Sequence, residues 1–178
     1  MLETISELEL PPELDAAIRD LLCRCFPPDV SIFSQSRHWH GSAPAYSVVD
    51  RSDDGRLKGH MAVVVRRIRA GVQPALVAGI QNMAVAPDWR GQGVGDALMH
   101  AAMDEARRRD IPFGLLFCVP QLEKFYAALG WRRIDVDARM DFEGRVNVPI
   151  PGKNIVMVRE LAALSFPPGD LHLQGPDW

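Results

Sequence analysis

Three glycines at alternating positions, Gly91, Gly93 and Gly95, separate an apolar, strand-like run from a helical pattern. Glycine adopts backbone conformations that other residues avoid, and it lets a ligand approach the main chain closely. The first N–H groups of a helix have no partner within the helix, and the helix dipole is positive at that end. With the added charge of Arg90, such a turn can bind an anion. The spacing therefore predicts a loop that holds a diphosphate.

Two common phosphate-binding motifs do not fit this loop. The dinucleotide fingerprint G-x-G-x-x-G, counted from Gly91, requires a glycine where the chain has Asp96. The P-loop requires a Gly-Lys-Ser/Thr sequence, which does not follow here. A glycine-rich turn with a purely structural role is the alternative interpretation. The pattern that fits is Arg90-x-x-Gly93-x-Gly95.

A second pattern follows about thirty residues later. The segment from Lys124 to Trp131 reads as a short helix that carries Tyr126, ends at Gly130 and is followed by an aromatic residue. The two patterns resemble the two signatures of the GNAT (Gcn5-related N-acetyltransferase) superfamily. The similarity in the order of elements extends over roughly residues 45–159.

The resemblance implies an α/β (α+β) fold. Its central sheet would be mixed, mostly antiparallel and built of about six to seven strands, with about four helices beside it. The sheet would be splayed between the strand before the glycine loop and the next strand. Residues 1–178 would form a single domain, and we expect the tail, residues 165–178, to line the acceptor site.

The resemblance also implies acetyl-CoA as cosubstrate and a role for particular residues. Tyr126 would protonate the departing CoA thiolate, although a hydroxyl satisfied in the core is the alternative for any single tyrosine. The strand before the loop would offer its backbone to the pantetheine arm, which adds like an extra strand: Met83, Ala84 and Val85. The loop and helix start would hold the pyrophosphate: Arg90, Gly91, Gln92, Gly93, Val94, Gly95 and Asp96.

The identity of the base is less evident. An attacking amine must lose a proton, and several GNAT enzymes place a glutamate where this chain has Gln81 and Asn82. His60, on the preceding strand, titrates in the right range, although a structural histidine is the alternative. The other candidates are Asp177 and the terminal carboxylate of Trp178, if the tail is ordered rather than disordered.

A closer resemblance concerns the acceptor. Segments around residues 36–41, 59–71, 85–88 and 168–176 resemble the nodulation N-acyltransferases, a family that moves fatty acyl groups onto an amino-sugar oligosaccharide. The strand with His60, the loop at residues 88–92 and the ending in Trp178 are similar to aminoglycoside 2′-N-acetyltransferases. We therefore expect transfer of an acetyl group to a primary amine of a small molecule, with an amino sugar or aminoglycoside favoured. Trp39 and Gln81 would contact this substrate, together with Asp177 and Trp178.

Two alternatives stay open. A long-chain N-acyltransferase of the nodulation type would need a wide apolar channel and would prefer a donor carried by a carrier protein. A non-catalytic sensor that binds acyl-CoA would explain Gln81 where a base is common. Trp39 lies in an irregular stretch, residues 29–44, which would form either a rim over the site or a loop that fills a gap in the core.

Several elements must position these groups. We expect strands at residues 2–9 and 45–50, a long hairpin made of residues 58–69 and 72–86, and strands at residues 113–118, 131–142 and 153–161. Helices are predicted from Pro11 to Cys25, over residues 93–109 and over residues 121–129. A Pro/Gly-rich connection would span residues 144–152. The tail would be ordered only if Leu171, Leu173 and Trp178 are captured by the core.

Composition limits the class of protein. With 178 residues and a net charge of −3, the chain is unlike a nucleic-acid binder held by phosphate neutralisation. No apolar run is long enough for a membrane segment, and the sequence from Met1 to Thr4 lacks the basic-then-apolar pattern of a signal peptide, so we expect neither. Cys23, Cys25 and Cys118 form neither a disulfide nor a zinc framework, so we expect no metal. These features favour a cytoplasmic protein with a small-molecule substrate. Exposed strands within residues 131–161 would allow two copies to pair as a homodimer.

Overall fold

The computed structural model describes residues 1–150 and 155–178. Four α-helices occur in this part of the chain: α1 (Pro12–Cys25), α2 (Val30–Phe33), α3 (Val94–Arg108) and α4 (Glu123–Ala128). Ten strands form one sheet: β1 (Leu2–Ser6), β2 (Tyr46–Arg51), β3 (Leu57–Ala70), β4 (Gln73–Val85), β5 (Phe113–Cys118), β6 (Arg132–Ile134), β7 (Ala138–Phe142), β8 (Arg145–Pro149), β9 (Ile155–Glu160) and β10 (Leu171–His172).

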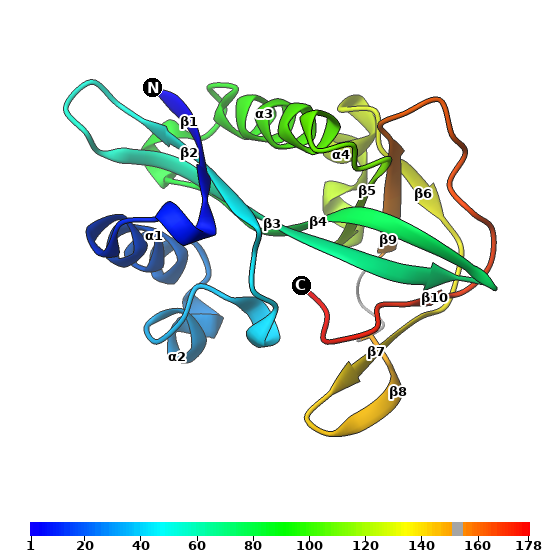
Figure 1. Cartoon of the computed structure of the whole chain (residues 1–178). Coiled ribbons are helices and arrows are strands. Elements are labelled where there is room, and N and C mark those ends of the chain that lie inside the picture. The colour runs from blue at the N-terminus through cyan, green and yellow to red at the C-terminus, as the bar shows by residue number, and fades with distance from the viewer. Residues whose placement is uncertain (151–154) are drawn as a thin grey trace.

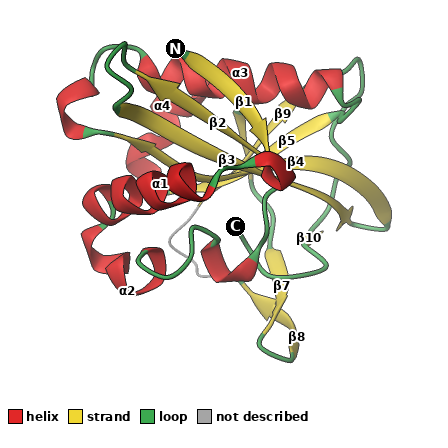
Figure 2. Ribbon diagram, turned by 60° about the vertical axis from the view of Figure 1, so that its left-hand side comes forward, coloured by secondary structure: helices red, strands yellow, loops and turns green. Residues whose placement is uncertain are grey.

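The sheet is mixed and mostly antiparallel, as predicted. Its main path runs β6-β9-β5-β4-β3-β10-β7-β8, and β1 and β2 extend from β3. Among the described strands, β4 pairs with β5 and β10 pairs with β7 in parallel. The α3 helix lies along one face of the sheet, whereas α1 and α2 lie on the opposite face (Figures 1 and 2). This arrangement confirms the α/β class.

The long hairpin of β3 and β4 is the centre of the sheet and confirms the predicted pairing. The two strands are antiparallel from Ala70 opposite Gln73 to Gly59 opposite Val85. Gly71 turns the chain with a φ of 56°, a value that favours glycine. The register shifts between His60 and Ala62, where Asn82 adopts a φ of 52°. This irregularity bends β4 just before the glycine loop.

The sheet opens between β4 and β5, which confirms the predicted splay. Their pairing is confined to residues 77–79 of β4 and residues 113–115 of β5. Beyond Gly79 and Leu115 the two strands continue to Val85 and Cys118 without pairing to each other. One edge of β4 therefore carries backbone groups that β5 does not satisfy.

Three clusters of buried side chains fix these layers. One lies between the sheet and the helices α3 and α4, with Leu98 and Met103 fully buried. Another lies under α1, around Ile18 and Leu22. The third joins the sheet to the tail through Leu171 and Leu173. Apolar residues at helical spacing on α1 and α3 thus face the sheet, in line with their amphipathic pattern.

The chain after α4 differs from the prediction. The single strand expected over residues 131–142 is two strands, β6 and β7, separated by residues 135–137. The connection expected over residues 144–152 contains β8, while residues 151–152 lie outside the described part. Glu143 and Gly144 both have positive φ values, of 52° and 75°, so they form a tight turn that pairs β8 with β7. With β10 in the tail, the sheet has more strands than predicted.

Candidate active site

The glycine loop is open, as a diphosphate site requires. Gly91 and Gly93 have φ values of 71° and 77°, and a Cβ added to either would meet no atom within 4 Å. Helix α3 begins at Val94, directly after Gly93, without a side chain that caps its first N–H groups. These groups face a cavity of about 620 Å³ lined by Gly91, Gly93, Val94, Gly95 and Asp96. Unpartnered N–H groups at a helix start suit an anion.

The opposite wall of this cavity is the end of β4. Met83, Ala84 and Val85 line it together with Arg90. The Val85 carbonyl accepts hydrogen bonds from Arg90 Nε at 3.1 Å and from Cys25 Sγ at 3.4 Å. Gln92 is the one residue of the predicted loop set that does not line the cavity. Its side chain instead donates to the Asp88 carbonyl at 2.9 Å.

A second cavity, of about 310 Å³, adjoins the first where β4 and β5 part. The two cavities share Phe26, Met83 and Leu122 in their walls. Apolar side chains dominate the second cavity, including Ile80 and Leu116 from the two diverging strands. A ligand with phosphates at the start of α3 and an arm along β4 would end in this cavity. We refer to the two spaces as the phosphate cavity and the acceptor cavity.

Tyr126 lines the acceptor cavity from α4. Its side chain is 6% exposed and packs against Phe125 and Trp131. Burial, and secondarily the neighbouring Cys118 thiol, raise the pKa of Tyr126. Burial also raises the pKa of Cys118, to about 11. Both groups are therefore neutral near pH 7, and the Tyr126 hydroxyl is available as a proton donor.

The tail is ordered, and its last two residues line the second cavity. Asp177 and Trp178 lie in its wall, which Tyr126 and Trp39 also line. Asp177 Oδ1 contacts His40 Nδ1. The Ser42 hydroxyl donates to the Asp177 carbonyl at 2.7 Å, and Arg66 donates to the Pro176 carbonyl at 2.5 Å. These bonds explain why the tail adopts one position.

Gln81 has a different role from the one expected. It is buried and does not line either cavity. Its Oε1 accepts from the Trp39 N–H at 3.2 Å, and its Nε2 donates to the Ser42 carbonyl at 3.1 Å. Gln81 therefore fixes the loop that carries Trp39, which places that ring in the acceptor wall.

His60 lies away from both cavities, so its position gives the expected base role no support. The side chain is fully buried, and Nε2 is 3.2 Å from the Ser47 hydroxyl. Nδ1 has no hydrogen-bond partner of regular geometry among the described residues, although the Asn82 backbone is close. Burial, followed by the charge of Arg37, lowers the pKa of His60 to about 3. A neutral imidazole of such low basicity is a structural group.

The buried imidazole leads to a prediction about stability and pH. The ordinary pKa of 6.5 applies to the unfolded chain, whereas the folded value is about 3. Between these values the unfolded chain takes up a proton that the folded protein does not. The contribution of His60 is therefore complete above pH 6.5 and is lost as pH falls towards 3. At pH 4.5 we expect a loss of about 2–3 kcal/mol in the free energy of unfolding.

Urea unfolding of wild type and His60→Gln at pH 7.5 and pH 4.5 measures this contribution. Carboxylates with lowered pKa values, such as Asp15 and Glu160, weaken both proteins in acid and cancel in the comparison. The variant should show the smaller pH dependence. If the free energy of unfolding fell equally for both proteins between pH 7.5 and pH 4.5, His60 would be accessible to protons in the folded state.

Sequence reasoning missed some of the cavity wall. His40, which contacts Asp177, stands in the aromatic stretch beside Trp39 but was not singled out. Asn82 lines the acceptor cavity and donates to the Arg37 carbonyl at 2.8 Å. Phe26 and Leu122 line both cavities. Single apolar residues at the ends of predicted helices give no signal that they face a ligand.

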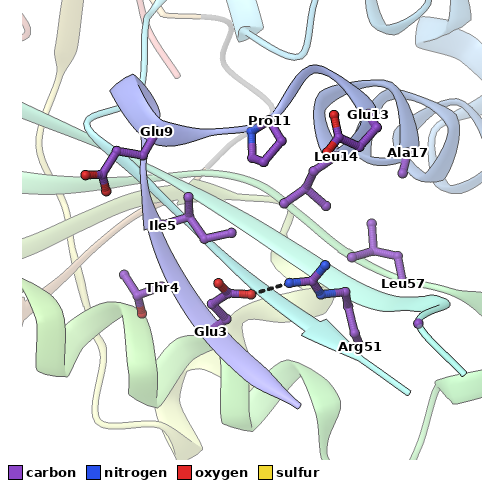
Figure 3. A pocket seen from close by; sticks show the side chains of 11 residues that line it. Glu3, Thr4, Ile5, Glu9, Pro11, Glu13, Leu14, Ala17, Arg51 and Leu57 are labelled. Carbon is purple, nitrogen blue, oxygen red and sulfur yellow. Dashed lines mark hydrogen bonds and ion pairs between the residues drawn. The ribbon is translucent and has the colours of Figure 1, made fainter. Parts of the chain in front are cut away.

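A third cavity, of about 440 Å³, lies between β1, α1 and the β2–β3 turn and contains none of the predicted site residues. Glu3 and Arg51 form an ion pair across it (Figure 3). No group of three or more His, Cys, Asp or Glu side chains that could hold a metal occurs in residues 1–150 and 155–178. None of the helices described is long and apolar enough to cross a membrane.

The splayed sheet, the bare start of α3 and the short α4 with its tyrosine define the fold class of the GNAT acyltransferases. Two solved structures share this fold. The GNAT family N-acetyltransferase YhbS from Escherichia coli, in complex with CoA, is 19% identical with a TM-score of 0.67, and the match covers 98% of this chain and 89% of that one. A GNAT family acetyltransferase from Brucella melitensis, in complex with acetyl-CoA, is 18% identical with a TM-score of 0.65, over 96% and 94% of the two chains.

The family follows from sequence similarity. The family model described as Nodulation protein A (NodA) matches residues 3–141. Nodulation protein A from Bradyrhizobium elkanii is 30% identical over 134 residues, which are 72% of this chain. The match spans 61% of the length of that relative. The chain belongs to the NodA family, which confirms the resemblance to the nodulation proteins.

Proposed function

We propose that this protein is an N-acyltransferase that moves an acetyl group from acetyl-CoA to a primary amine of a small molecule. One observation carries the proposal. The open glycine loop leads along the unpaired edge of β4 into a small acceptor cavity that holds a buried tyrosine and a carboxylate. The loop and the β4 edge suit a thioester donor, and the tyrosine and the carboxylate suit an amine acceptor, so both substrates would be held next to each other.

The residues present fit CoA. The N–H groups at the start of α3, together with the Arg90 side chain in the cavity wall, would hold the pyrophosphate. The edge of β4 at Met83 and Val85, which β5 leaves unpaired, would pair with the amides of the pantetheine arm, as an added strand does, with the arm replacing the Arg90 and Cys25 donors at the Val85 carbonyl. The cosubstrate supplies an activated acyl thioester. Gly95 faces the same cavity, so its missing side chain leaves the path clear.

The proposed reaction is direct attack within a ternary complex. The neutral amine nitrogen attacks the thioester carbonyl, the C–S bond breaks, and the amide N–C bond forms. Asp177, directly or through water, would take the proton that the ammonium loses. The Tyr126 hydroxyl would give a proton to the thiolate of CoA. The second proton, which the nitrogen loses as the amide forms, would pass through water to restore that hydroxyl, so that the products are an amide and free CoA.

The acceptor cavity favours an amine attached to a flat or ring-shaped molecule. Trp39 offers an aromatic surface in the cavity wall, and Asp177 offers a negative charge for a cation. An amino sugar or aminoglycoside has both a ring and an amine. This preference agrees with the resemblance of the chain to acyltransferases of amino sugars.

Membership of the NodA family supports a second candidate, a long-chain N-acyltransferase. The small volume of the acceptor cavity favours a short acyl group over a long one. A sensor that binds acyl-CoA without turnover is the third candidate. Calorimetry with CoA tests what the acetyltransferase and the sensor both require, because absence of binding at millimolar concentration would exclude both and leave only a transferase that takes its acyl group from a carrier protein.

Release of free thiol separates the candidates. Acetyl-, octanoyl- and palmitoyl-CoA are each incubated with a panel of amino sugars and aminoglycosides. Faster release from acetyl-CoA supports the proposal, and faster release from the long-chain donors supports the second candidate. Binding without amine-dependent release from any donor would favour the sensor.

Tyr126→Phe tests the proposed acid. We expect kcat to fall about 100-fold, because the thiolate would leave without a proton donor. The affinity for CoA, measured by calorimetry, should stay within a factor of about two, since the hydroxyl acts only as the thiolate leaves. Tyr46→Phe is the matched control, because Tyr46 is the other tyrosine and its buried hydroxyl donates to the Ala102 carbonyl at 2.8 Å. Unchanged turnover of Tyr126→Phe with every amine would contradict the acid role.

A further inference from the structure

Trp178 occupies space that a glycine leaves free in the central strand. A Cβ added to Gly79 of β4 would lie 2.5 Å from Trp178 Nε1 and 2.6 Å from Cζ2. Gly79 is not among the residues with positive φ, so its backbone conformation is open to any residue. The missing side chain at Gly79 is therefore needed for the indole ring and not for a turn.

This contact lies at the point where the sheet opens. Gly79 and Leu115 form the last pair between β4 and β5. Trp178 also packs on Phe117 of β5, with ring centroids 5.9 Å apart. The indole thus covers the closed end of the splay, and the same ring lines the acceptor cavity. Figure 1 shows the C-terminal end of the chain on the sheet face opposite α3.

The ring is held in place from several sides. It is 6% exposed, and the Arg66 guanidinium lies 5.2 Å from its centroid. Arg66 also donates to the Ser42 hydroxyl at 3.0 Å, which in turn bonds the Asp177 carbonyl. The indole Nε1 is buried without a hydrogen-bond partner among the described residues. An unsatisfied N–H is costly, so packing and not a hydrogen bond of the indole keeps the ring in this position.

We infer that Trp178 limits the length of the acyl group that this protein accepts. The inference rests on the proposed function, in which the thioester lies where β4 and β5 part. A cavity of about 310 Å³ must hold both the acyl group and the amine, and this volume is at the lower end for small-molecule sites. A longer chain that follows the diverging strands meets the indole at Gly79. Removal of the ring would extend the cavity between Phe117 and Gly79.

The test compares the affinities of acetyl-, butyryl-, hexanoyl- and octanoyl-CoA by calorimetry, with CoA as the reference. The affinity of wild type should not increase further for acyl chains longer than that of butyryl-CoA. In Trp178→Ala each further buried methylene should raise the affinity by up to about fourfold, so that the ratio of hexanoyl-CoA to acetyl-CoA affinity rises at least about tenfold. Trp178→Phe, which keeps a smaller ring, should show an intermediate ratio and guards against loss of folding in the alanine variant.

Leu173→Ala is the control for a general loosening of the tail. Leu173 is fully buried in the same tail but lines neither cavity, so this variant should be less stable with an unchanged chain-length profile. Normal CoA binding with the same profile in wild type and both Trp178 variants would overturn the inference and leave the proposed function intact. Absence of CoA binding in wild type would overturn the proposed function, and the acyl limit with it. Strong binding of octanoyl-CoA by wild type would also overturn the limit.

Discussion

We expect the Gly95→Asp variant to bind CoA about 1000-fold more weakly than wild type while it keeps its fold. The new carboxylate would stand at the start of α3, where the pyrophosphate is proposed to lie. Repulsion between charges about 5 Å apart costs on the order of 3 kcal/mol per pair at an effective dielectric constant of 20. The helix itself should tolerate the change, because an acidic residue in the first turn complements the helix dipole. Calorimetry with CoA and thermal unfolding measure the two effects.

His100→Glu is the matched control for Gly95→Asp. His100 is exposed further along the same helix and lines neither cavity. The variant adds one negative charge to the exposed side of α3, one turn beyond Asp96, whose carbonyl lies 2.8 Å from His100 Nδ1. CoA affinity should therefore change less than threefold at physiological ionic strength. Similar affinities of Gly95→Asp and wild type would place the phosphates elsewhere and remove the basis of the proposed site.

Arg37→Met should lower the free energy of unfolding by about 3–5 kcal/mol. Arg37 is 5% exposed and lies between two carboxylates, with Nε 2.6 Å from Asp15 Oδ1 and both terminal nitrogens on Glu7. Burial disfavours its charge, but hydrogen bonds and charges from Glu7 and Asp15 raise the pKa of Arg37 above its usual value. Without the guanidinium, the partly buried Glu7 loses its charged partner, and Asp15 keeps only Arg19, at 2.8 Å. Urea unfolding at pH 7 measures the loss.

Two further variants show whether the loss of stability in Arg37→Met comes from the buried ion-pair network. Arg37→Lys should recover little stability, because an ammonium cannot bond both carboxylates in the same fork geometry. Arg24→Met removes an exposed pair with Asp20 on the same helix as Asp15 and should cost less than about 0.5 kcal/mol. If Arg37→Met were as stable as Arg24→Met, the buried network would not support the fold.

The glycine loop and the hairpin could be predicted because their signals are local. Turn residues, alternation and the helical period at α3 all lie within a short window. The splay between β4 and β5 came from the resemblance, since no local pattern says that two strands stop pairing after Gly79 and Leu115. Strand β8 was missed because the glycines and prolines in and around it, from Gly144 to Gly152, resemble a loop, while the turn at Glu143 and Gly144 is what forms the hairpin.

The candidate bases show where sequence reasoning ends. His60 and Asp177 were both candidates, and their chemistry alone could not separate them. His60 is on a strand face covered by α1 and the loop with Arg37, so it is fully buried. Asp177 reaches the acceptor cavity through contacts with His40 and Ser42, about 135 positions earlier in the chain. Contacts over such separations depend on the tertiary fold and leave no periodic trace in the sequence.

The position of β10 has a consequence for how the molecule forms. The strand lies between β3 and β7, with Leu171 paired to both Ala70 and Ala138, and in the described sheet β7 and β8 join the rest through it. During synthesis the edges of β3 and β7 are complete long before residues 171–172 emerge. Contacts between such distant segments slow folding, and unpaired edges attract other chains. Aggregation of the nascent protein should therefore depend on how quickly this short strand is inserted.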